Sequence, residues 1–91
     1  MATQRMLVTG LVQRVGFRDF VVRIARQHGL VGWVRNRADG SVEILATGDD
    51  AALGVLLEAC REGPGRGRVD HVEASPADYS GEKGFTKRLT A

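Results

Sequence analysis

Within the stretch GLVQRVGFRDFVVRIA (residues 10–25), the pattern of apolar residues changes from that of a β-strand to that of an α-helix. Residues 6–12, MLVTGLV, are rich in β-forming residues and predict a strand. From Phe17 onward, one face repeats at helical spacing: Phe17, Phe20, Val21, Ile24, Ala25 and His28. Gly29 follows, and glycine commonly ends a helix. The stretch therefore predicts a strand, a short loop and a helix.

Two further β-rich runs, residues 30–35 and 41–47, are separated by the turn sequence NRADG. Asn and Asp-Gly favour tight turns, so the two runs are predicted to form a hairpin. The second run alternates in character, with Val42, Ile44 and Ala46 on one face and Ser41, Glu43 and Thr47 on the other.

The second half of the chain predicts one more helix and two more strands. Asp49 or Asp50 is expected to cap the helix, and its buried face comprises Leu53, Leu56, Leu57 and Cys60. The sequence EGPGRGR (residues 62–68) ends it, and residues 69–75 and 85–89 are the expected strands. The element order predicts an α+β fold, a ferredoxin-like split βαβ sandwich (βαββαβ) with a mostly antiparallel sheet and two helices on one face.

Length and composition limit the classes of protein that fit. A chain of 91 residues builds a single core, so one domain, 1–91, is expected. A net charge of +2 is too weakly basic to make nucleic acid the expected partner. No apolar run approaches the ~18 residues of a membrane span, and we expect a cytoplasmic monomer that does not bind membranes. With Cys60 as the one cysteine, no disulfide or metal site is expected.

The junction between the first strand and the first helix is the leading candidate for a binding site. Backbone N–H groups in such a loop and at a helix start have no internal acceptor, and the helix dipole adds positive potential. Arg18 would add a cation suited to phosphate oxygens. Asn36 follows a strand that we expect near the first one, so its amide could orient a water, although a simple turn-forming role is also open.

Two blocks of this sequence carry a family resemblance. GLVQRVGFR (residues 10–18) resembles the acylphosphatase signature G-x-V-Q-G-V-x-F-R, and GWVRNRADGSVE (residues 32–43) resembles that family's second block, G-x-V-x-N-x-x-D-G-S-V-E. The sequence YSGE (residues 79–82) is similar to the family's tail, and the resemblance spans nearly the whole chain.

The resemblance implies hydrolysis of the carboxyl–phosphate bond of small acyl phosphates to carboxylate and inorganic phosphate, with neither metal nor cofactor. It implies that Arg18 and Asn36 are catalytic, with Asn36 orienting the attacking water. It further implies that phosphate is held by Arg18 and the loop amides around Gln13, Arg14, Val15, Gly16 and Phe17.

Arg14 departs from the pattern, because the family has glycine at this position. We expect Arg14 to adopt a left-handed conformation at a cost of ~1–2 kcal/mol and so to preserve the loop. The departure keeps open a non-catalytic anion-binding or regulatory domain. An RNA-binding module of the RRM type shares the element order, but residues 41–47 carry none of the stacking aromatics that it needs.

Overall fold

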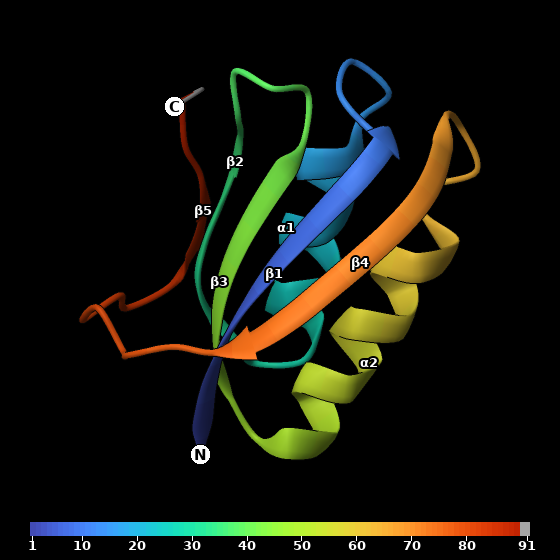
Figure 1. The fold of residues 1–91 in the computed structure, drawn as a ribbon. Coiled ribbons are helices and arrows are strands. Elements are labelled where there is room, and N and C mark those ends of the chain that lie inside the picture. The colour runs from blue at the N-terminus through green and yellow to red at the C-terminus, as the bar shows by residue number, and fades with distance from the viewer. Residues whose placement is uncertain (90–91) are drawn as a thin grey trace.

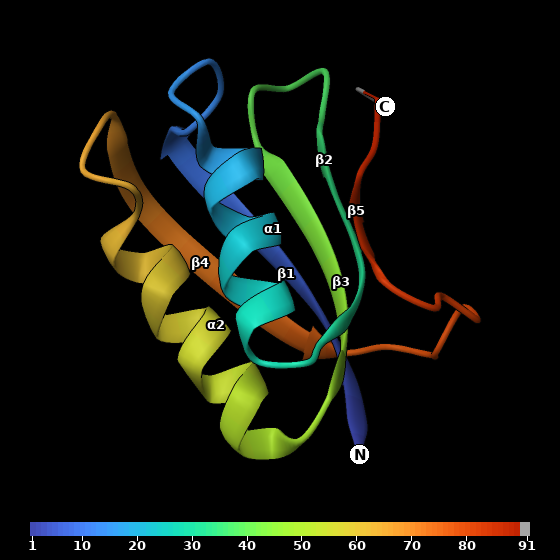
Figure 2. The ribbon, with the colours of Figure 1, turned by 180° about the vertical axis from the view of Figure 1, so that it is seen from behind.

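The computed structural model describes residues 1–89 and contains five strands and two helices within them. In chain order these are β1 (Ala2–Leu11), α1 (Phe17–Gln27), β2 (Val31–Asn36), β3 (Val42–Gly48), α2 (Asp50–Glu62), β4 (Arg68–Pro76) and β5 (Phe85–Lys87). The strands form one sheet in the order β4-β1-β3-β2-β5, and both helices cover the same face of it (Figures 1 and 2). This architecture confirms the predicted ferredoxin-like sandwich.

The described sheet contains three antiparallel strand pairs and one parallel pair. β1 runs antiparallel to both β3 and β4, and β2 and β3 form the predicted antiparallel hairpin. β5 pairs in parallel with β2, on the edge opposite β4. β2 lies near β1 in the same sheet, as expected, with β3 paired between the two strands.

The core lies between the sheet and the helices, and the predicted apolar faces supply it. Phe17, Val21 and Ala25 of α1 are buried against Leu53, Leu56 and Cys60 of α2 and against the sheet. His28 was expected on the same stripe, but it is exposed just beyond the last turn of α1. Leu57 is half-buried at the margin of the core.

The face of the sheet away from the helices is also largely covered at its centre. Val42, Ile44 and Ala46 of β3 join the helix-side core, as their alternation predicted. The opposite set is buried too, with Glu43 5% and Thr47 8% exposed. Strands on both sides of β3, together with the arginine side chains that reach Glu43, shield this face from water.

Tertiary pairing moves several element boundaries from their predicted positions. β1 begins at Ala2 instead of Met6, because its first residues pair with the end of β3. β5 ends at Lys87 instead of Leu89. Asp49 occupies the N-cap of α2 as expected, but its side chain makes no capping hydrogen bond.

The end of β1 approaches the start of β4 closely at Gly10. The strand register shifts between Thr9 and Gly10, and Gly10 has a φ of 127°. A Cβ added at Gly10 would lie 2.2 Å from the carbonyl oxygen of Arg68. Glycine is therefore required here by both conformation and space, and it allows β1 to end in the loop that precedes α1.

Candidate active site

The predicted site residues gather at one end of the sheet. The loop from β1 to α1 (residues 12–16) and the end of β2 lie at this end, to which the C-terminal segment also runs (Figure 1). A cavity of about 160 Å³ is bounded there by Arg14, Gly16, Phe17, Arg18 and Asn36 of the predicted set, together with Val12, Asp19 and Lys87. Gln13 and Val15 are not among the residues that line it.

The loop holds a row of backbone donors without acceptors. Arg14 has a φ of 64° and Gly16 a φ of 77°, so both adopt the left-handed conformation. Within residues 1–89, no backbone N–H group from Gln13 to Asp19 donates a hydrogen bond to another part of the chain. These donors lie at the positive end of the α1 dipole, which favours an anion there.

Arg14 adopts the conformation that the family's glycine would permit. Its positive φ confirms the expectation that arginine accepts left-handed geometry at this position. The side chain is exposed, so the arginine fits without displacing a core residue. The departure from the family pattern therefore adds a positive charge to the border of the cavity and leaves the turn in place.

Arg18 is held at the cavity by the C-terminal segment. It lies in the first turn of α1, and its Nη1 donates a hydrogen bond to the carbonyl oxygen of Arg88 at 2.9 Å. Arg88 is positioned in turn by its own N–H, which donates to Val34 of β2 at 2.8 Å. One contact to a neutral carbonyl leaves the guanidinium with further N–H donors for an anion.

Asn36 brings an unpaired polar atom to the same cavity. The residue is only 8% exposed, and within residues 1–89 its Oδ1 has no hydrogen-bond partner. Burying an amide oxygen without a donor costs about 1–3 kcal/mol. Because Asn36 also lines the cavity, its unpaired acceptor is suited to a bound water or substrate, and a simple turn-forming role does not require it.

Gln13 and Asp39 connect the loop to the β2–β3 hairpin. The Nε2 of Gln13 donates to the carbonyl oxygens of Arg37 at 2.7 Å and Ser41 at 2.9 Å. Asp39 accepts hydrogen bonds from the hydroxyl and the N–H of Ser41, and these bonds lower the pKa of Asp39. The hairpin that presents Asn36 and the loop that precedes α1 are thus fastened to each other.

Two charged residues of the cavity were absent from the sequence-based prediction. The Nζ of Lys87 lies 2.8 Å from the Oδ1 of Asp19, joining β5 to the first turn of α1. Alternation places Lys87 on the same face of β5 as the buried Phe85, which is a signal that the sequence contains. Its neighbourhood depends on the pairing of Lys87 with Val34, which sequence periodicity does not reveal.

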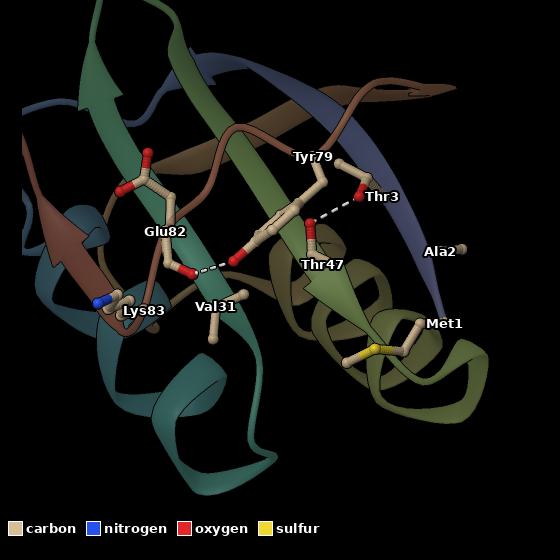
Figure 3. Close-up of a pocket in the computed structure, with 8 residues that line it drawn as sticks. All are labelled: Met1, Ala2, Thr3, Val31, Thr47, Tyr79, Glu82 and Lys83. Carbon is tan, nitrogen blue, oxygen red and sulfur yellow. Dashed lines mark hydrogen bonds between the residues drawn. The ribbon is translucent and has the colours of Figure 1, made fainter.

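A larger cavity, of about 580 Å³, lies at the opposite end of the sheet (Figure 3). It is formed by the first residues of β1 and β2, the end of β3 and the segment around Tyr79. Its hydroxyl groups are already engaged, because Tyr79 donates to the carbonyl of Glu82 and the hydroxyls of Thr3 and Thr47 bond to each other (Figure 3). The unpaired donors and acceptor that suit phosphate chemistry lie at the smaller cavity.

Fold and site together define a ferredoxin-like domain with a cavity, bordered by Arg14, Arg18 and Asn36, at one end of its sheet. The family model for acylphosphatase matches residues 4–87. An acylphosphatase of Acidiphilium cryptum is 47% identical over 90 residues, covering 99% of each chain, and one of Koribacter versatilis is 56% identical over 75 residues, covering 82% of this chain and 68% of its own. The chain belongs to the acylphosphatase family, whose members are hydrolases of acyl phosphates.

The solved structures agree with this assignment. The crystal structure of acylphosphatase from Bacillus subtilis superposes with a TM-score of 0.92 at 39% identity, covering 97% of this chain and 99% of that one. An acylphosphatase from Coxiella burnetii gives a TM-score of 0.85 at 34% identity, covering 96% and 92%. The likenesses of sequence and of structure thus point to the same family.

Two further observations concern residues 1–89. Neither of their helices is long and apolar enough to cross a membrane. Within the same residues, no three His, Cys, Asp or Glu side chains are grouped in a way that could hold a metal ion.

Proposed function

We propose that the cavity at the β1–α1 loop is the catalytic site, in which Arg18 and the loop amides hold the phosphoryl group and Asn36 orients the attacking water. The observation that carries this proposal is the convergence of unpaired groups on one cavity. The loop and first helical turn that border the cavity have N–H groups without acceptors, and the unpaired Oδ1 of Asn36 can accept a hydrogen bond from water.

The reaction requires little acid–base chemistry from the protein. The water oxygen attacks phosphorus as the bond between phosphorus and the acyl oxygen breaks. A carboxylate departs, and a proton of the water passes to a phosphoryl oxygen. The conjugate acid of this leaving group has a pKa of ~4, like a glutamate side chain, so it departs near neutral pH without a general acid. The absence of a histidine from the cavity lining is compatible with this route.

Positioning and electrostatics then supply the rate. Charge accumulates on the equatorial oxygens of the transferring phosphoryl group, where fixed N–H donors and a guanidinium stabilise it. The hydrogen bond from Arg18 to Arg88 restricts the guanidinium before substrate arrives, which reduces the ordering required on binding. Arg14 contributes its amide and a further positive charge at the border of the cavity.

Hydrolysis of benzoyl phosphate, with and without a metal chelator, tests the assignment. We expect turnover that the chelator leaves unchanged and that Arg18→Ala and Asn36→Ala each lower by ~10²–10³ or more, the usual effect of losing a transition-state donor. Arg23→Ala is the matched control, because Arg23 is exposed on the same helix and does not line the cavity.

The alternatives have distinct outcomes in the same assay. Near wild-type turnover in a folded Arg18→Ala or Asn36→Ala variant would contradict the assigned roles. Phosphate binding without turnover in the wild-type protein would favour the non-catalytic anion-binding domain. Circular dichroism of each variant separates loss of function from loss of fold.

The proposal extends to a cytoplasmic monomer that does not bind nucleic acid. Trp33 is the aromatic of β2, but it is only 9% exposed, and the guanidinium groups of Arg35 and Arg88 both lie 4.9 Å from its ring centroid. Trp33 is therefore poorly placed to stack on a base. A mass near 9.8 kDa by light scattering, and no change in tryptophan fluorescence with single-stranded RNA, are expected.

A further inference from the structure

Asp19 places a negative charge where the proposed function requires the site to attract an anion. It lies in the first turn of α1, directly after Arg18, and it borders the same cavity. A carboxylate at a helix N-terminus is stabilised by the dipole, but here it also repels a phosphoryl group bound beside it. Left alone, Asp19 would oppose the charge of Arg18.

Lys87 of β5, which also lines the cavity, contacts this carboxylate. Its ammonium donates to Asp19 at 2.8 Å, and this hydrogen bond is the main cause of the lowered pKa of Asp19. The side chains are 46% and 73% exposed, respectively, so the pair adds little to the stability of the fold. Its position at the cavity is therefore better explained by the charge it contributes there than by stability.

We propose that Lys87 is a specificity-determining residue that neutralises Asp19 and thereby sets the preference of the cavity for a dianionic over a monoanionic ligand. The inference rests on the proposed function, since it requires phosphate to bind at Arg18 and the loop. As a unit, the Lys87–Asp19 pair is electrically neutral. Arg18 and Arg14 then determine the sign of the electrostatic potential in the cavity.

The sign and size of each effect follow from Coulomb's law. Lys87→Met leaves the charge of Asp19 uncompensated and weakens anion binding, whereas Asp19→Asn leaves Lys87 unpaired and strengthens it. The energy is proportional to the charge of the ligand, so the change in log Ki for a dianion is about twice that for a monoanion of similar shape. In the double variant both charges are gone, and binding returns close to that of the wild-type protein.

The experiment measures competitive inhibition of benzoyl phosphate hydrolysis by sulfate, a dianion, and by methanesulfonate, a monoanion, at low ionic strength. For Lys87→Met we expect Ki to rise ~5- to 10-fold for sulfate and ~2- to 3-fold for methanesulfonate. For Asp19→Asn both values fall by similar factors, and for the double variant both lie within about twofold of wild type. Added salt should shrink every difference.

Arg61→Met is the matched control, because Arg61 forms an exposed ion pair with Glu58 on α2 and does not line this cavity. Unfolding measurements on all variants verify that each is fully folded under the assay conditions. A merely structural pair predicts equal changes for the two inhibitors. If Lys87 contacted the ligand directly, Lys87→Met would still weaken sulfate binding in the Asp19→Asn background. Either result overturns the inference.

The failures of the two proposals are distinguishable. Loss of turnover in Arg18→Ala together with unchanged inhibition constants in Lys87→Met overturns the role of Lys87 and keeps the site. Full turnover in Arg18→Ala overturns both.

Discussion

The side-chain nitrogen of Gln13 lies 2.9 Å from the carbonyl oxygen of Ser41, and it also donates to Arg37 in the same hairpin. One side chain therefore fastens the loop before α1 to the hairpin that carries Asn36. The proposed phosphate donors and the proposed water-positioning residue come from separate parts of the chain. Their spacing depends on this contact as well as on the strand pairing beneath it.

Gln13→Met should loosen the loop while keeping the volume of the side chain. Losing two hydrogen bonds is expected to lower the free energy of unfolding by about 1–2 kcal/mol and kcat/KM for benzoyl phosphate by about tenfold, because the donors are less well fixed. Hydrogen exchange at residues 13–18 should rise. Gln27→Met, at the exposed end of α1, is the control, and an equal loss of activity there would contradict the role of Gln13.

Arg14→Gly removes the backbone strain at φ 64° together with one charge. Relief of the left-handed conformation, ~1–2 kcal/mol, is partly offset by the greater freedom of glycine in the unfolded chain, so we expect stability to rise by about 1 kcal/mol or less. Turnover should stay within about threefold of wild type, since the loop is already intact.

Arg14→Ala separates the two contributions, because alanine removes the charge and keeps the strain. It should be less stable than Arg14→Gly and should match it in activity. A large gain in turnover for Arg14→Gly would mean that the natural loop is impaired.

Glu43 makes the stability of the sheet sensitive to acid. Burial alone would raise the pKa of Glu43, but hydrogen bonds from Arg5 and Arg35 outweigh burial and hold the pKa below its ordinary value of 4.5. The unfolded state therefore binds the proton first as pH falls. The stabilisation is fully present above pH 4.5 and is lost as pH drops through the lowered pKa.

Glu43→Gln should lower the free energy of unfolding by about 2 kcal/mol at pH 7 and by progressively less as the pH falls below 4.5. Urea denaturation across this range measures the difference. Glu58→Gln, whose carboxylate is exposed, should show a much smaller difference at every pH. A difference between Glu43→Gln and wild type that does not depend on pH would contradict this account.

Cys60 should be unreactive until the protein unfolds. Burial raises the pKa of its thiol to about 12, so the thiolate that attacks iodoacetamide is very scarce at pH 8. We expect alkylation of the folded protein to be slower by about 10³ or more than in denaturing urea. Because the chain has one cysteine, the mass shift reports this site alone. Rapid alkylation under native conditions would contradict the burial of Cys60.

The fold could be predicted from local sequence patterns because apolar residues repeat at helical spacing in the helices and mostly alternate with polar residues in a strand such as β3. The helical spacing from Phe17 and the alternation at Val42, Ile44 and Ala46 both indicate which side chains leave water, and the structure packs these faces into the core apart from the exposed His28. Boundaries such as Ala2 were less predictable. The start of β1 has a weak apolar pattern and becomes a strand because β3 lies alongside it.

The sequence by itself determined the element order and the family resemblance that named Arg18 and Asn36 and implied a left-handed Arg14, because these depend on residue types at short spacing. Tertiary structure alone decided that Arg18 is held by Arg88, that Lys87 faces Asp19, and that the oxygen of Asn36 is left unpaired at their cavity. These contacts join residues far apart in the chain. The contacts of Arg18 and Lys87 form because β5 pairs in parallel with β2 and so brings residues 87 and 88 beside the start of α1. This pairing depends on the packing of the whole sheet, and no local sequence pattern specifies it.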